Sequence, residues 1–109
     1  MPSFRENVIA FIKKVPKGKV VSYGQVAAYA GSPRAARQVG GILRSLNIAD
    51  GKVPWWRVVN NAGVISIKGN WTATKELQAR LLKKEGVLVN RNYTLSIKKY
   101  RWNLHENIL

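Results

Sequence analysis

The sequence predicts a mainly α-helical fold with small β hairpins, arranged as a winged helix-turn-helix. Apolar residues recur at helical spacing in several segments, and short β-branched runs separated by turn residues fill most of the remainder. Only Gly31 and Ser32 separate two of the expected helices, a connection typical of a helix-turn-helix. A chain of 109 residues suits one compact unit, so residues 1–109 are expected to form a single domain.

The first helix is expected to begin after Ser3. Ser3 and Glu6 have the spacing of a capping box, in which each side chain bonds to the other residue's backbone N–H. The Pro-Lys-Gly segment at 16–18 ends this helix. Between these signals runs an apolar stripe of Phe4, Val8, Phe11, Ile12 and Val15.

A second capping box, formed by Ser22 and Gln25, begins the next expected helix, which covers about residues 23–30. Gly31 suits the position just after a helix, where a left-handed backbone is common. Ser32 and Pro33 have the residue types of an N-cap and a first helical position. They predict a third helix that runs from there to about residue 46.

The pattern changes in the second half of the chain. The segments 57–59 and 64–65 are expected to form a hairpin around a turn at 60–63. A fourth helix is expected over about 72–85, with Gly86 closing it. A second hairpin is expected from 87–89 and 93–95, around a turn at 90–92. The tail at 98–102 is basic and aromatic.

Charge is the unusual feature of the composition. The chain has 19 Lys and Arg against 5 Asp and Glu, a net charge of +14, which points to a polyanion as partner. A solvated basic surface without a particular partner is the alternative. There is no cysteine, and a single histidine, His105, leaves too few ligands for zinc, so neither a metal nor a cofactor is expected. No membrane span or signal peptide is recognisable, so we expect an intracellular protein.

The third expected helix combines long basic and very small side chains. Small residues let a backbone approach a phosphate-lined groove while arginines reach past it. Two adjacent glycines in a helix cost about 1 kcal/mol each relative to alanine, so they are expected to serve either this approach or contact with a neighbouring helix. The residues concerned are Arg34, Ala35, Ala36, Arg37, Gly40, Gly41 and Arg44.

Three segments occur in an order and spacing that resemble a known family. They are Val21-Ser22-Tyr23-Gly24-Gln25-Val26-Ala27, Ser32-Pro33-Arg34-Ala35-Ala36-Arg37-Gln38-Val39-Gly40-Gly41 and Pro54-Trp55-Trp56-Arg57-Val58-Val59. Together they resemble the C-terminal domain of the O6-alkylguanine-DNA alkyltransferases, over about residues 4–95. In that family the third motif reads Pro-Cys-His-Arg-Val, and its cysteine accepts the alkyl group. A tryptophan at that position is the mark of the alkyltransferase-like proteins, which bind the lesion without repairing it.

The resemblance implies roles for two residues of the helix-turn-helix. Tyr23 matches the tyrosine that presses on the phosphate of the flipped nucleotide, and Arg37 matches the arginine that fills the gap in the base stack. Unstacking a base costs a few kcal/mol, which such contacts offset. From the residues alone, Tyr23 also fits a half-buried tyrosine at a helix start, and Arg37 a phosphate contact or plain surface charge.

The third motif departs from the enzymes at two positions. Trp55 stands where the alkyl acceptor would be and supplies an apolar wall without a nucleophile. Trp56 replaces the histidine that activates the cysteine, a departure also from many alkyltransferase-like proteins. The family's relay ends in a glutamate that Glu85 matches, and with neither partner to serve, Glu85 is expected to be structural. Alkyl transfer is therefore excluded.

The loop after the first hairpin is expected to close over the base. Lys68 is nearest to the arginine that family members stack on guanine; lysine makes a cation–π contact but does not stack as a plane. Trp71 is a further candidate for the pocket wall. Trp102 is expected either to cover DNA or a partner, or to anchor the tail on the core.

The sequence therefore predicts a non-catalytic sensor of DNA damage. It would bind duplex DNA through the minor groove as a monomer, flip O6-alkylguanine into a pocket and flag it for nucleotide excision repair proteins. We expect it to be cytoplasmic and DNA-associated, or nuclear in a eukaryote. The alternatives are a generic winged-helix regulator or architectural protein and, less favoured because nucleophile and base are missing, an enzyme of other chemistry.

Two sets of residues carry this prediction. The lesion pocket is expected to comprise Tyr23, Val53, Pro54, Trp55, Trp56, Arg57, Lys68 and Trp71. The DNA-binding surface is expected to comprise Tyr23, Ser32, Arg34, Ala35, Ala36, Arg37, Gln38, Gly40, Gly41 and Arg44.

Overall fold

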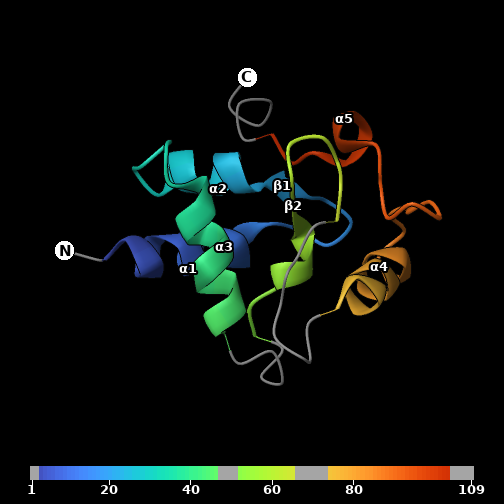
Figure 1. The fold of residues 1–109 in the computed structure, drawn as a ribbon, viewed down its shortest axis with the longest axis horizontal. Helices are drawn as coiled ribbons and strands as arrows, with labels where there is room; N and C mark the ends of the chain where they lie inside the picture. The colour runs from blue at the N-terminus through green and yellow to red at the C-terminus, as the bar shows by residue number, and fades with distance from the viewer. Residues whose placement is uncertain (1–2, 47–51, 66–73, 104–109) are drawn as a thin grey trace.

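The computed structural model describes residues 3–46, 52–65 and 74–103. It is mostly helical with one small sheet, which confirms the predicted fold class. Figure 1 shows α1, α2 and α3 on one side and α4 on the other, with the two strands between them. The elements, in chain order, are α1 (Phe4–Lys14), β1 (Val21–Ser22), α2 (Tyr23–Tyr29), α3 (Ala36–Ser45), the 3₁₀ turn η2 (Trp55–Arg57), β2 (Val58–Val59), α4 (Lys75–Lys84) and α5 (Ile97–Tyr100).

Both predicted capping boxes are confirmed. At the start of α1, the Ser3 hydroxyl accepts from the Glu6 N–H at 3.1 Å, and the Glu6 carboxylate accepts from the Ser3 N–H. At the start of α2, the Ser22 hydroxyl and the Gln25 side chain make the same reciprocal pair. These bonds satisfy backbone donors that have no partner within the helix, so both helices begin at the predicted residues.

The predicted start of the third helix is wrong. α3 begins at Ala36, with Ala35 at its N-cap, rather than at Pro33 after a Ser32 cap. The backbone N–H of Ser32 instead donates to the Ala27 carbonyl, and its carbonyl accepts from the Ala35 N–H, both at 2.9 Å. Ser32 therefore completes the end of α2 and a turn, and the connection between the two helices is longer than expected.

The first predicted hairpin is also wrong in its pairing. β2 pairs with β1 in parallel, with Val21 opposite Val58 and Ser22 opposite Val59. Val58 and Val59 are both buried, so this run lacks the alternation of a one-sided hairpin and matches a strand covered on both faces. The turn at 60–63 does form, since the Gly63 N–H donates to the Asn60 carbonyl.

The second predicted hairpin is replaced by contacts between the two turns. Val64 forms an isolated antiparallel bridge with Thr94, and the Leu95 N–H donates to the Gly63 carbonyl at 2.9 Å. Gly63 has φ +81°, and a Cβ there would lie 2.2 Å from the Leu95 carbonyl oxygen. The close approach that glycine allows therefore brings the two turns together, and the segment 87–89 forms no strand.

The last two helices differ from expectation at their ends. α4 begins at Lys75, where the Thr74 hydroxyl accepts from the Leu77 N–H, and it ends at the predicted place with Glu85 as its C-cap. Residue 72, the predicted start, lies outside the described residues. α5 was not predicted, because four residues are too few to show a helical period.

Two buried clusters form the core. The first joins α1, α2 and α3 and includes Trp55, while the second joins Val59, Ile65 and Leu82 around α4. Trp56 packs against both clusters. No helix within the described ranges is long and apolar enough to cross a membrane.

Candidate nucleic-acid interface

The exposed face of α3 is basic and formed partly of small residues. Val39 and Leu43 are buried in the core, while Arg37, Gln38 and Arg44 are exposed. Arg37, Gly41 and Arg44 follow the i, i+4, i+7 spacing of one helical face. At the N-terminal end of this face lies a shallow hollow of about 400 Å³, lined by Ser32, Pro33, Arg34, Ala35 and Gln38.

The glycine pair lies beneath the guanidinium of Arg44. A Cβ added to Gly40 would lie 3.6 Å from Arg44 Nη1 and 4.0 Å from Tyr23 Cε1, and one added to Gly41 would lie 3.8 Å from Arg44 Nη2. These are ordinary van der Waals distances, so the packing within the described chain does not require glycine at either position. The structure thus brings Tyr23 of α2 close to Gly40 and Arg44 of α3.

Trp55 and Trp56 lie at right angles in η2. Their ring centroids are 6.0 Å apart with an interplanar angle of 87°, the edge-to-face arrangement that aromatic pairs favour. Trp55 is 2% exposed and belongs to the first core cluster, against which Tyr23 and Val53 also pack. Pro54 is buried as well. Trp55, Tyr23 and Val53, three of the expected pocket residues, therefore belong to or pack against one core cluster.

Trp56 donates a hydrogen bond from its indole N–H to Glu85, with 2.9 Å between Nε1 and Oε2. The same carboxylate accepts from Arg57 through Nε at 3.0 Å and Nη2 at 2.6 Å, and from the Gly18 backbone N–H. Arg57 also donates to the Val15 carbonyl. Glu85 thus holds η2, α4 and the α1–β1 connection together, consistent with the expected structural role.

The pKa of Glu85 lies below its ordinary value of 4.5. Burial of the carboxylate raises the pKa, but the hydrogen bonds from Arg57, Trp56 and the Gly18 N–H lower it by more. The group is therefore held as the anion, and the Trp56 indole gives it a hydrogen-bond donor that does not titrate.

Gln78 is a site residue that the sequence analysis missed. It is 1% exposed, and its Nε2 donates to the carbonyls of Trp56 at 3.0 Å and Val58 at 2.9 Å. Its amide fixes the backbone of η2 and β2 from α4. The available signal was its place four residues before Leu82, on the helix face that the leucine buries.

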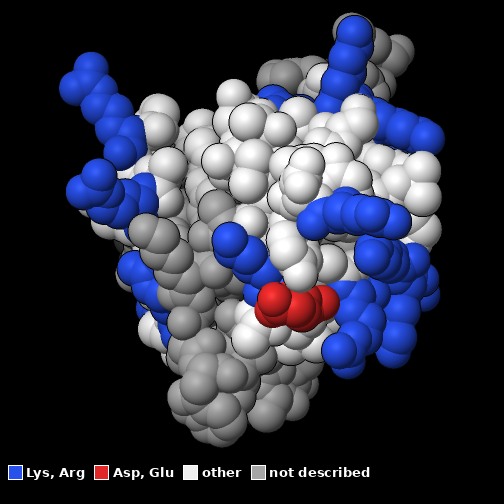
Figure 2. All heavy atoms as spheres, turned by 45° about the vertical axis from the view of Figure 1, so that its right-hand side comes forward, with Lys and Arg blue, Asp and Glu red and all other residues white. Residues whose placement is uncertain are grey.

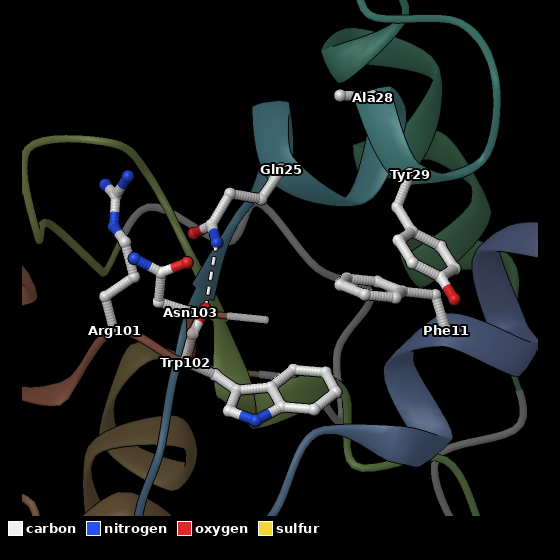
Figure 3. A pocket seen from close by; sticks show the side chains of 7 residues that line it. All are labelled: Phe11, Gln25, Ala28, Tyr29, Arg101, Trp102 and Asn103. Carbon is white, nitrogen blue, oxygen red and sulfur yellow. Dashed lines mark hydrogen bonds between the residues drawn. The ribbon is translucent and has the colours of Figure 1, made fainter. Parts of the chain in front are cut away.

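The tail is anchored on the core by Trp102. Its indole lies 5.7 Å from the Phe11 ring, its backbone N–H donates to the Val20 carbonyl, and its carbonyl accepts from Gln25 Nε2 at 3.1 Å. Figure 3 shows this indole on one side of Phe11 and the Tyr29 ring on the other. Of the two roles expected for Trp102, the structure shows the anchor. Lys68 and Trp71, the expected loop residues of the pocket, lie outside the described residues.

Positive charge extends well beyond α3. Figure 2 shows the face that carries α4, where Lys and Arg side chains gather around a small acidic patch. Arg80, Lys83 and Lys84 are exposed on this helix. A long-range attraction to a polyanion would therefore act over more of the surface than the α3 face alone.

Comparisons with known proteins agree on one family. The family model described as 6-O-methylguanine DNA methyltransferase, DNA binding domain, matches residues 3–87. The DNA base-flipping protein of Escherichia coli K12 is 44% identical over 101 residues, covering 93% of this chain and 75% of that protein. Alkyltransferase-like protein 1 of Schizosaccharomyces pombe is 39% identical over 106 residues, covering 97% of this chain and 94% of its own length.

A solved structure extends the agreement to the fold. The crystal structure of S. pombe Atl1 in complex with damaged DNA containing O6-carboxymethylguanine matches with a TM-score of 0.84 at 36% identity. The match covers 94% of this chain and 99% of that chain.

Proposed function

The chain belongs to the family of the 6-O-methylguanine DNA methyltransferase DNA-binding domain, and we propose that within it this protein recognises O6-alkylguanine by base flipping without repairing it. The observation that carries the proposal is Trp55. The resemblance of the third motif to the alkyltransferases matches it to the acceptor cysteine, and the sequence contains no cysteine at all. Because alkyl transfer of this kind needs a thiolate, binding of the lesion is not followed by transfer of the alkyl group to this protein.

The surroundings of Trp55 support a binding site that is fixed in advance. Trp55 is held edge-to-face by Trp56, whose indole is bonded to Glu85, and Gln78 fixes the Trp56 and Val58 carbonyls. Because the residues around Trp55 are already ordered, its side chain loses little conformational entropy when a base binds. In this proposal the alkylated base binds beside Trp55 and Tyr23, and because Trp55 is 2% exposed, the side chains that cover its indole move aside when the base enters. Lys68 and Trp71 are further expected contacts of the base.

Extrusion of the base is assigned to the helix-turn-helix. Arg37 is exposed on α3 and enters the base stack from the minor groove, while Tyr23 presses on the phosphate of the flipped nucleotide. The remaining residues of the α3 face contact the DNA backbone, which positions the protein without reading sequence. Support comes from the match to a relative named for base flipping and to a relative solved on alkylated DNA.

A sensor without chemistry needs a partner to act on the lesion. We propose that the protein acts as a DNA-associated monomer, in the cytoplasm or in the nucleus of a eukaryote, and presents the adduct to nucleotide excision repair proteins.

The test is an equilibrium binding measurement at fixed salt on two matched duplexes, one with guanine and one with O6-methylguanine at the same position. The proposal expects tighter binding to the alkylated duplex. Equal affinity would sink lesion recognition and favour a generic winged-helix binder. Arg37→Ala should abolish most of the preference while reducing overall affinity modestly. Arg80→Ala, the same charge change on exposed α4, is the matched control and should leave the preference intact.

A further inference from the structure

A second recognition surface lies away from α3, on α1, the end of α2 and the tail. Its first part, called here the aromatic hollow, has a volume of about 450 Å³ and is lined by Phe11, Tyr29 and Trp102, with Gln25, Arg101 and Asn103 at its polar side. Of its lining residues, only Trp102 has DNA among its expected contacts, and none belongs to the expected DNA-binding surface of α2 and α3. Its volume lies within the range of about 300–1,000 Å³ for binding pockets, enough for one large apolar side chain.

The aromatic walls come from three separate segments and include an exposed ring. Phe11 is buried and stacks on Tyr29 with 4.2 Å between ring centroids, while Tyr29 remains 51% exposed. Trp102 faces the same space from the tail, as Figure 3 shows. Tryptophan, tyrosine and arginine are enriched among the residues that dominate binding energy at protein interfaces. The two aromatic residues combine a large apolar area with few rotatable bonds.

The polar side of the hollow is held in place by the fold. Gln25 Oε1 accepts from the Ser22 N–H, and its Nε2 donates to the Trp102 carbonyl. Arg101 Nη2 donates to Asn61 Oδ1 at 2.7 Å, which uses one of the five N–H donors of a guanidinium. The guanidinium is thus oriented and keeps donors for an acceptor from outside.

A second hollow of about 330 Å³ adjoins the first and shares Arg101 and Asn103 with it. It is lined in addition by Ile97 and Lys98, and is called here the basic hollow. At the far side of the aromatic hollow, Lys14 Nζ lies 5.8 Å from the centre of the Tyr29 ring. The described residues that line the two hollows include no Asp or Glu. An apolar site therefore lies between positive charges.

We propose that these two hollows form a docking site for an acidic segment of a partner protein. An aromatic or large aliphatic side chain of that segment occupies the aromatic hollow, and neighbouring carboxylates pair with Lys98 and Arg101 on one side and Lys14 on the other. Charge complementarity selects this occupant, since an apolar anchor flanked by carboxylates matches both the rings and the cations. The inference rests on the proposed function, because a sensor that hands over a lesion requires such a contact.

The probe is the synthetic peptide acetyl-Asp-Asp-Phe-Asp-Asp-amide, titrated into the isotope-labelled full chain without DNA. Shifts in the NMR signals of the Trp102 indole and the Gln25 side-chain amide report on the aromatic hollow. The proposal expects saturable binding that weakens about tenfold or more when the peptide's Phe is replaced by Ala, or its Asp residues by Asn. Equal binding of all three peptides, or none, overturns it.

Variants of the protein locate the peptide. Tyr29→Ala and Lys98→Glu should each weaken peptide binding about tenfold or more. Leu88→Ala, which truncates another exposed apolar residue (71% exposed), and Lys99→Glu, a neighbouring charge reversal outside both hollows, are the matched controls and should have little effect. Loss of binding in the controls as well would show a non-specific attraction and overturn the site.

Other occupants are separated by two further readouts. Displacement of the peptide by an unmodified duplex would assign the hollows to DNA, and Tyr29-dependent self-association in sedimentation would assign them to a second copy of the chain; either result overturns the proposal. Lesion preference is measured on the same preparations without peptide. Because the two measurements share no ligand, failure of docking and failure of lesion recognition are distinguishable.

Discussion

Arg57 and Glu85 form an ion pair that joins η2 to the C-cap of α4. Two bonds connect them, from Nη2 to Oε2 at 2.6 Å and from Nε to Oε1 at 3.0 Å. The side chains are 14% and 7% exposed, so solvent screens the pair only weakly. The Glu85 carboxylate fastens the segment carrying Trp55 and Trp56 to the rest of the fold.

Glu85→Gln should therefore destabilise the protein, and the loss should depend on pH. Hydrogen bonds to a charged group contribute about 1.5–3 kcal/mol, so we expect the free energy of unfolding at neutral pH to fall by about 2 kcal/mol. A carboxyl whose pKa is lowered by folding stabilises the fold above its unfolded pKa, and this contribution is lost as pH falls through the lower folded value. The gap between wild type and variant should shrink below pH 4.5.

Urea unfolding across a pH series measures this gap. Glu76→Gln is the comparison, because Glu76 lies on the same helix and its pKa is also lowered, but the side chain is exposed and accepts from the Tyr93 hydroxyl at 3.4 Å. Its gap should change with pH in the same direction but stay smaller, since interactions of exposed charges contribute little. A gap for Glu85→Gln that stays constant into acid would show that the charge of Glu85 does not stabilise the fold.

Gly63→Ala should disrupt the contact between the two turns. The new Cβ would overlap the Leu95 carbonyl oxygen in a backbone already at φ +81°, so both strain and a steric clash oppose it. Gly31→Ala has the same unfavourable sign of φ, at +98°, but no atom within 4 Å of the Cβ. We expect a loss of about 1–2 kcal/mol at Gly31 and at least about 2 kcal/mol more at Gly63. The difference in free energy of unfolding between the two variants, measured by thermal or urea unfolding, isolates the effect of the clash. Similar losses of stability would contradict the close packing of Gly63 against Leu95.

Gly41→Ala should change stability and DNA binding in opposite directions. The added Cβ meets only Arg44 Nη2 at 3.8 Å, and alanine favours the helix by about 1 kcal/mol, so the folded state should become more stable. If α3 approaches the DNA backbone closely, the same methyl group should weaken duplex binding. Unfolding and binding measured on one preparation check both signs. Unchanged DNA affinity would show that the glycine pair does not serve close approach.

Trp55→Cys should not restore alkyl transfer. The new thiol would have Trp56 beside it instead of a base, and Glu85 would remain occupied by Trp56 and Arg57. Replacing a tryptophan that is 2% exposed should also destabilise the core by about 3 kcal/mol or more. Intact-mass spectrometry after incubation with an O6-methylguanine duplex checks the chemistry. A stoichiometric methyl adduct on residue 55 would contradict the view that Trp56 removes a necessary group.

The sequence was most informative where a structural signal is local. Ser3 with Glu6 and Ser22 with Gln25 lie within one helical turn, and both caps formed as predicted. The prediction that Ser32 caps the third helix is wrong. A serine before proline suits an N-cap, but the Ser32 N–H donates to the Ala27 carbonyl and completes the end of α2. Val58 and Val59 were recognisable as a strand, but an apolar run without alternation does not indicate its partner, which lies 37 residues earlier in the chain.

In the candidate site too, the sequence predicts the individual residues better than the tertiary contacts between them. The motifs identified Tyr23, Arg37 and Trp55 through their resemblance to a family, and the structure places Tyr23 and Trp55 against one core cluster. The partners of Trp56 depended on tertiary structure, because Glu85 and Gln78 lie on α4, more than 20 residues away in sequence. Gln78, a polar residue on a helix face otherwise occupied by leucines, is the sequence feature that indicates such a buried contact.

The parallel pairing of β1 with β2 has a consequence for how this protein tolerates changes of length. Each strand has only two residues, yet Tyr23 directly follows one and Trp55–Arg57 directly precede the other. The pairing of β1 with β2 therefore fixes the position of Tyr23 relative to Trp55 and Trp56, because no linking residue separates α2 or η2 from the strands. A single inserted residue within 21–23 or 55–59 would turn one partner of the site away from the other.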